Sequence, residues 1–156
     1  MPFRITGLDA ERFRHLFGLP ESDLLRQGAR RHVADRRSKL PDRIELRDAQ
    51  PGESLLLVNY FHQPADNPYR ASHAIFPRES AAAVPFNGVD EIPPASASRV
   101  ISLRGFDTDD MMVDAEPSDG AVLNEGIGRL FANPEIAYIQ AHFARHGCYA
   151  ARIDRL

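Results

Sequence analysis

Ser-Leu-Leu-Leu-Val-Asn-Tyr, residues 54–60, is the stretch that decides the fold. Its four consecutive apolar residues follow a turn at Asp48–Glu53, which has Pro51 and Gly52 at its centre. A short apolar run bounded by turn residues is typical of a strand that is buried on both faces. The sequence therefore predicts a strand at the centre of a sheet here. Ser72–Phe76 is predicted as the next strand, because Pro77 cannot continue it.

The rest of the chain combines short strands with a few helices. Alternating apolar residues predict strands at Phe3–Thr6, Arg31–Ala34, Arg43–Leu46, Val100–Leu103 and Met111–Ala115. Caps and apolar spacing predict helices at Ala10–Phe17, from Pro20 to a stop at Gly28, and at Gly120–Phe131. The segment Ala81–Ser98 is rich in alanine, proline and serine, which predicts a long irregular loop.

The C-terminal segment fits two structures when only its residues are considered. Asn133 as a cap, Pro134 in the first turn and Gly147 as a stop fit a helix over 134–147. Two apolar runs, Ile136–Phe143 and Cys148–Ile153, fit a β-hairpin around residues 144–147 equally well. In either case the elements indicate an α+β fold with a largely antiparallel sheet of about six to eight strands and two or three helices.

Length and charge limit both the size of the protein and its class of partner. The chain of 156 residues is suited to a single domain, residues 1–156. Apolar residues make up 43% and charged residues 26%, an ordinary globular composition. The formal net charge of −3 argues against a nucleic-acid partner, which selects for excess basic charge. Residues 26–47 are nevertheless rich in arginine, and residues 105–128 are acidic without a single base.

The cellular compartment is predicted from the absence of targeting signals. The first residues, MPFRITGLDAERF, contain no apolar core of a signal peptide. No apolar run approaches the length that crosses a bilayer. With Cys148 as the only cysteine, no disulfide forms within the chain. We therefore expect a soluble, cytoplasmic protein of bacterial type that has no membrane partner.

The connection between the two central strands is the candidate ligand-binding site. Residues 61–71 form a predicted loop that is longer than most hairpin loops and is stiffened by two prolines. A rigid loop on a buried strand holds side chains in fixed positions, which favours binding. A guanidinium and a phenol in this loop suit an anion. The predicted ligand-binding residues are Asn59, His62, Tyr69, Arg70 and Ser72.

These residues predict a binding or regulatory domain that recognises an anionic small molecule or the carboxylate of a partner. One alternative is a small enzyme, a hydrolase or acid–base catalyst, with His62 or His142 as the base. Another is a structural or interaction protein, and a homodimer is compatible with it. No metal-ligand spacing occurs and no cofactor motif is present, so neither a metal nor a cofactor is expected.

Several long segments resemble the bacterial domain-of-unknown-function family 1203. They are LLLVNYFHQPADNPYRASHAIFPRE (55–79), SRVISLRGFD (98–107), MMVDAEPSDG (111–120) and GCYAARIDR (147–155). The resemblance implies a compact single domain, a strand-like segment at 136–143 and hence the C-terminal hairpin, but no activity. In this family a cysteine commonly follows the proline that matches Pro41. Asp42 stands there instead, which argues against a thiol mechanism.

Overall fold

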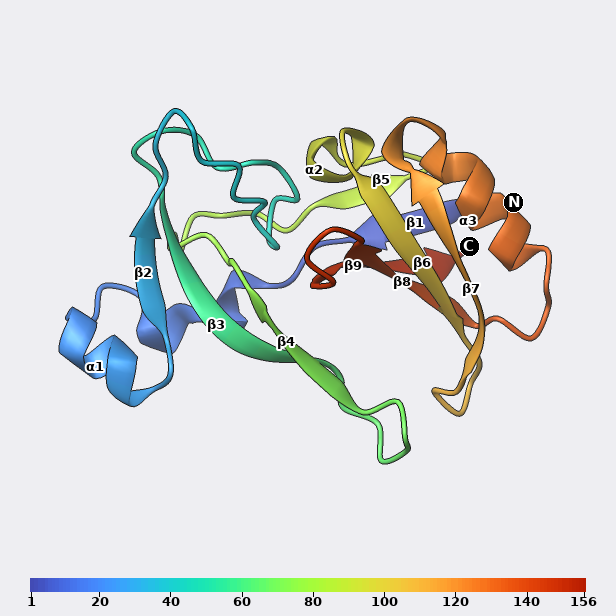
Figure 1. Cartoon of the computed structure of the whole chain (residues 1–156), viewed down its shortest axis with the longest axis horizontal. Helices are drawn as coiled ribbons and strands as arrows, with labels where there is room; N and C mark the ends of the chain where they lie inside the picture. Colours follow the sequence, from blue (N-terminus) through green and yellow to red (C-terminus); the bar gives the residue numbers. More distant parts are fainter.

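The chain forms two antiparallel sheets that lie next to each other (Figure 1) in a computed structural model describing residues 1–156. One sheet has six strands in the order β5-β1-β9-β8-β6-β7, and the other has three in the order β2-β3-β4. The strands are β1 (Phe3–Thr6), β2 (Arg30–Val33), β3 (Ser54–Gln63), β4 (Ala71–Ile75), β5 (Asn87–Val89), β6 (Val100–Phe106), β7 (Met112–Asp119), β8 (Tyr138–Phe143) and β9 (Tyr149–Arg155).

Helices are few and short, and the longest covers the six-stranded sheet. The helices are α1 (Glu21–Arg26), α2 (Pro94–Ala97) and α3 (Leu123–Phe131), with 3-10 turns η1 (Ala10–Arg12), η2 (Arg14–Leu16) and η3 (Gly120–Val122). The predicted α+β class, the antiparallel sheet and the C-terminal hairpin β8–β9 are all confirmed. None of the helices is of sufficient length and apolarity to cross a bilayer.

Strand β3 lies at the centre of its sheet, as its apolar run predicts. Leu55 and Leu56 are fully buried, and the strand pairs with β2 on one side and β4 on the other. It continues to Gln63, past an irregularity in the register between Tyr60 and Gln63. The connection to β4 is therefore residues 64–70, shorter than the predicted loop, because strand pairing extends beyond the apolar run.

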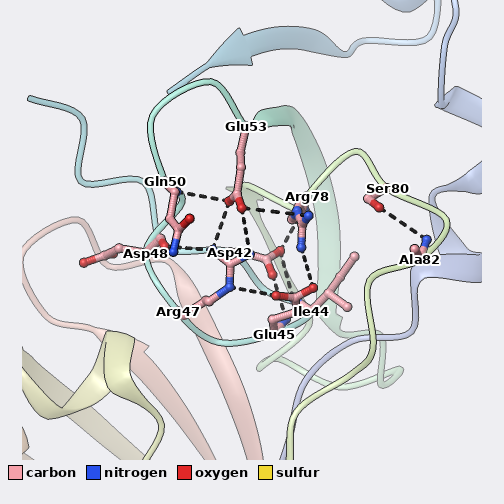
Figure 2. A network of polar contacts seen from close by, with 10 residues as sticks. All are labelled: Asp42, Ile44, Glu45, Arg47, Asp48, Gln50, Glu53, Arg78, Ser80 and Ala82. Atoms are coloured by element: carbon pink, nitrogen blue, oxygen red, sulfur yellow. Dashed lines mark hydrogen bonds and ion pairs between the residues drawn. The ribbon is translucent and has the colours of Figure 1, made fainter. Parts of the chain in front are cut away.

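The prediction of a strand at Arg43–Leu46 is wrong, because the carboxylate of Asp42 binds the backbone N–H groups that would otherwise pair with a neighbouring strand. Asp42 accepts hydrogen bonds from the backbone N–H of Ile44 (3.0 Å), Glu45 (2.6 Å) and Arg78 (2.7 Å), as Figure 2 shows. Leu46 then takes a positive φ of 54°. Such local side-chain capping competes with sheet pairing and produces a turn.

Two further expectations need correction. The predicted helix Ala10–Phe17 is instead two 3-10 turns, η1 and η2, because Phe13 between them takes φ −116° and interrupts the helical geometry. The predicted irregular loop Ala81–Ser98 contains strand β5 and helix α2. Strand β5 forms because the edge of β1 is free to pair with it, a long-range contact that local composition does not reveal.

Two main hydrophobic clusters hold the fold together. The larger cluster packs helix α3 on the six-stranded sheet, and its members include Ile127 of the helix and Leu103 and Ile139 of the sheet. The second cluster joins the three-stranded sheet to the N-terminal turns and contains Tyr149 of β9. Strand β9 therefore contributes to both clusters, and the hairpin β8–β9 is where the sheets meet.

Candidate functional site

Two cavities are lined by residues of both sheets. The first, of about 590 Å³, is lined among others by Lys39, Arg43, Arg99, Arg145, His73 and Cys148, and is called the basic cavity. The second, of about 410 Å³, is lined among others by Tyr60, Tyr149, His62, Gln140, Arg12 and Arg152, and is called the tyrosine cavity. Both lie within the size range of cavities that bind small molecules.

Positive charge dominates the basic cavity. Four cationic side chains line it, against a single carboxylate, Asp48. That carboxylate is already paired, because Arg99 Nη2 lies 2.7 Å from its Oδ1. Lys39 and Arg145 are exposed and form no ion pair. The excess of cations in a concave site attracts anions.

Arg43 is the most unusual residue of the basic cavity, since its guanidinium is buried without a carboxylate partner. Only 1% of the surface of Arg43 is exposed to solvent. Nε donates to the carbonyl of Tyr149 (2.6 Å), Nη1 to that of Pro41, and Nη2 to Cys148 Sγ (3.1 Å). Burial lowers the pKa of Arg43, but a guanidinium stays charged in proteins. A buried cation of this kind favours a nearby anion.

The thiol of Cys148 lines the same cavity, as does His146 of the hairpin turn, whereas His142 of strand β8 does not. The N–H of Phe143 donates to the carbonyl of Cys148 (2.9 Å), and His142 is in register with Tyr149. Adjacent strand residues point to opposite faces, so the side chains of His142 and Cys148 lie on different sides of the hairpin. The register therefore separates the imidazole from the thiol.

A chain of polar contacts lies at the wall of the tyrosine cavity. Gln140 Oε1 is 2.8 Å from His62 Nδ1 and 3.1 Å from His142 Nε2, while Gln140 Nε2 donates to the carbonyl of His62 (2.9 Å). Burial lowers the pKa of His62, and it lowers the pKa of His142 to about 3, helped by the positive charge of Arg104. Both imidazoles are thus neutral at neutral pH.

The five residues predicted to bind a ligand are not gathered in one cavity. Of the five, only His62 lines either of the two cavities. Asn59 is exposed on β3, and Ser72 is half-buried on β4. Tyr69 is 37% exposed and its ring meets Phe106 edge-on.

Arg70 is available to solvent, as the anion-binding prediction requires, but it stands outside both cavities. It is exposed, and Nη1 donates to the carbonyl of Pro64 (2.5 Å). Its guanidinium lies 4.8 Å from the centre of the Phe61 ring. No acid of the chain pairs with it, so the acidic stretch at 105–128 does not neutralise it.

The cations of the basic cavity come from three separate places in the sequence. Lys39 and Arg43 belong to the arginine-rich stretch, whereas Arg99 and Arg145 stand alone in other segments. The arginine excess was the only available signal, and it does not indicate which arginines converge. No three histidine, cysteine or acidic side chains come together as metal ligands would.

Comparison with known proteins identifies a family but no activity. Residues 39–155 match the family model described as a protein of unknown function, DUF1203. No curated protein matches the chain, and no solved structure matches it. All the residues that line the basic cavity fall within the matched range, whereas the tyrosine cavity also uses Thr6, Gly7, Leu8, Asp9 and Arg12.

Proposed function

The chain belongs to the DUF1203 family, for which no activity is described, and from the geometry we propose that it is a small binding domain for an anionic small molecule. The ligand would occupy the basic cavity. The observation that carries the proposal is the buried guanidinium of Arg43, which has carbonyl and thiol partners but no carboxylate. An anion in this cavity would add a direct partner to the longer-range attraction that the Asp42 carboxylate gives this cation.

The lining also indicates what else the ligand carries. Leu57, Phe76 and Phe143 form apolar parts of the wall, and the guanidinium of Arg99 lies 5.3 Å from the centre of the Phe143 ring. Apolar walls with a few charged groups are typical of sites for organic molecules. The proposed ligand therefore has a carboxylate or phosphate on an apolar body.

Benzoate and benzamide test this proposal, because they share a ring and differ in charge. We expect calorimetry to detect benzoate binding and to detect no binding of benzamide. The double variant Lys39→Ala/Arg145→Ala should weaken benzoate about fivefold to tenfold, since two exposed cations each contribute modestly. Both side chains are exposed and unpaired, so the fold should persist.

Arg70→Ala is the matched comparison, because Arg70 is also an exposed arginine without an ion pair. If the ligand lies in the basic cavity, this variant binds benzoate as the wild type does. Benzoate binding that is lost in Arg70→Ala and kept in the double variant would instead place the site at the loop predicted from the sequence. Equal binding of benzoate and benzamide would contradict an anion site altogether.

An acid–base enzyme is a second candidate, and the accessibility of His62 favours it. His142 is fully buried, with its ring nitrogens next to Gln140 and Gly147, so a substrate does not reach it. His62 is only half-buried and lines the tyrosine cavity. If catalysis occurs, the base would therefore be His62, with His142 as a positioning residue.

A further inference from the structure

We propose that the tyrosine cavity is a second binding site, for an anion that also carries a hydroxyl group. A hydroxy acid and a singly protonated oxyanion such as hydrogen phosphate both have this chemistry. The site shares no lining residue with the basic cavity. An experiment that refutes anion binding in the basic cavity therefore does not refute this second site. Its recognition groups are one hydrogen-bond acceptor, His62, and three donors, Tyr149, Arg12 and Arg152.

The acceptor is the Nε2 atom of His62. The amide nitrogen of Gln140 donates to the carbonyl of His62, which fixes the orientation of the amide. The amide oxygen consequently faces His62 Nδ1 at 2.8 Å, so Nδ1 carries the proton. A neutral imidazole protonated at Nδ1 has its lone pair at Nε2, and this atom has no partner within the protein.

The packing around His62 holds the ring in this state. Its plane is stacked on Tyr149, with ring centres 5.7 Å apart and an interplanar angle of 9°. His142 meets it edge-on at 4.8 Å and also contacts the amide oxygen of Gln140. Gln140 is 3% exposed and His142 fully buried, so both positioning groups are enclosed. A ring fixed on three sides presents its free nitrogen without further ordering.

The first donor is the phenol of Tyr149. This residue is 5% exposed, lines the cavity and makes no hydrogen bond through its hydroxyl. The hydroxyl is nevertheless not sealed, since no fully enclosed side-chain atom lacks a partner. Burial raises the pKa of Tyr149, so the phenol keeps its proton and acts as a donor. A phenol that is nearly buried and has no partner in the chain is free to donate to a ligand.

Two guanidiniums complete the anion-binding side. Arg12 and Arg152 both line the cavity. Burial, together with Tyr60 and the Asp154 carboxylate, raises the pKa of the Tyr149 phenol, and the two guanidiniums oppose this with a smaller effect. Arg12 forms no ion pair, and Arg152 is paired with Asp154 at 2.8 Å. Asp9 is the only carboxylate in the lining, and it caps the backbone N–H of Glu11. The lining thus offers an anion the Tyr149 phenol, the unpaired Arg12 and the remaining N–H groups of the Asp154-paired Arg152, and it offers an O–H group a single acceptor.

Two pairs of anions, each with one member that carries a hydroxyl group, separate the contribution of the hydroxyl to affinity from that of the negative charge. Lactate is compared with propionate, and inorganic phosphate with sulfate, which carries no hydroxyl at neutral pH. We expect NMR titration to show binding at the residues of the tyrosine cavity, with at least one hydroxyl-bearing anion about tenfold tighter than its matched anion. The pair that shows the larger ratio identifies whether the ligand is a hydroxy acid or a protonated oxyanion.

Variants assign the preference to named atoms. His62→Phe keeps the ring stacking and removes the acceptor, so the preference for the hydroxyl should fall to about equal affinity. Tyr149→Phe removes a donor and should weaken both members of a pair about fivefold. His15→Phe, at an exposed histidine outside both cavities, should bind as the wild type does.

The tautomer gives a readout that does not depend on any ligand. Long-range ¹H–¹⁵N spectra of the free protein should show His62 protonated at Nδ1, and Gln140→Met should remove this preference. A wild-type His62 protonated at Nε2 would overturn the proposal. It would also be overturned if neither pair of probes showed a preference for the hydroxyl, or if Arg145→Ala abolished binding that His62→Phe left intact.

Discussion

Gly7 shows how a single residue limits this fold. It follows β1, and its N–H donates to the carbonyl of Phe86 (2.9 Å). A Cβ atom at this position would lie 1.9 Å from the carbonyl oxygen of Ile44. The backbone of the turn over residues 42–46 is therefore packed directly against Gly7. Gly7 itself also lines the tyrosine cavity.

Gly7→Ala is expected to destabilise the protein by about 2 kcal/mol or more, because backbone atoms must move to admit the methyl group. Urea unfolding measures the change in the free energy of unfolding. The control is Gly128→Ala in helix α3, where no atom lies within 4 Å of the added carbon. That variant should gain about 0.5–1 kcal/mol from helix propensity. Equal effects of the two substitutions would show that the close approach at Gly7 is not realised.

At the level of elements, one ion pair ties strand β2 to its surroundings. Arg31 Nε and Glu79 Oε1 are 2.7 Å apart, and Arg31 Nη2 also donates to the carbonyl of Leu19 (2.8 Å). Glu79 further accepts from Ser54 Oγ (2.7 Å) and from the N–H of Gly18 (3.0 Å). The pair therefore joins the N-terminal turns, β2 and β3.

This cluster predicts a defined acid sensitivity. The contacts with Arg31 lower the pKa of Glu79 from its ordinary 4.5 to about 2, against the effect of burial. Because the folded pKa lies below the unfolded one, the stabilisation is complete above pH 4.5 and disappears as the pH falls towards 2. Allowing for solvent screening, it amounts to about 1–2 kcal/mol.

The measurement is the free energy of unfolding at several pH values between 2.5 and 6 for the wild type and Glu79→Gln. We expect a deficit in the variant that is present at pH 6 and mostly absent at pH 2.5. Glu135→Gln serves as the comparison, since Glu135 is exposed and forms no ion pair. A deficit that is independent of pH would refute the assignment to the charge of Glu79.

For the whole molecule, the important contact is the one between the two sheets. Tyr149 belongs to β9 of the six-stranded sheet, yet it packs in the cluster of the three-stranded sheet. Its ring meets that of Tyr60 on β3 at 5.7 Å and stacks on His62. The backbone carbonyl of the same residue accepts the bond from Arg43. One residue thus links the sheets, lines the tyrosine cavity and, through its carbonyl, holds Arg43 of the basic cavity.

Tyr149→Ala should therefore cost about 3–5 kcal/mol in the free energy of unfolding, the usual effect of deleting a buried ring. Tyr69→Ala removes the same ring from a position that is 37% exposed and should cost less than about 1 kcal/mol. Chemical denaturation of the two variants compares them directly. Similar costs would mean that the sheets do not depend on Tyr149 for their packing.

Much of the fold could be predicted because the signals are local. The apolar run at 55–58 identified the central strand, and the paired runs of the last segment, with the family resemblance, identified the hairpin. Arg43–Leu46 has the alternation of apolar residues that correctly predicted other short strands. It forms a turn instead, because Asp42 accepts a hydrogen bond from the backbone N–H of Arg78, which is distant in the sequence. Strand β5 was missed for a similar reason, since only its pairing with β1 distinguishes it from a loop.

The candidate sites depended on contacts that a linear pattern does not contain. Residue types and their order were sufficient to predict most strands and turns and to show that arginine is abundant. Which arginines converge was settled by the packing of the two sheets, which brings Lys39 and Arg43 to the same cavity as Arg99 and Arg145. The physical reason is that electrostatic and hydrogen-bonding partners act over a few ångströms in space, whatever their separation along the chain.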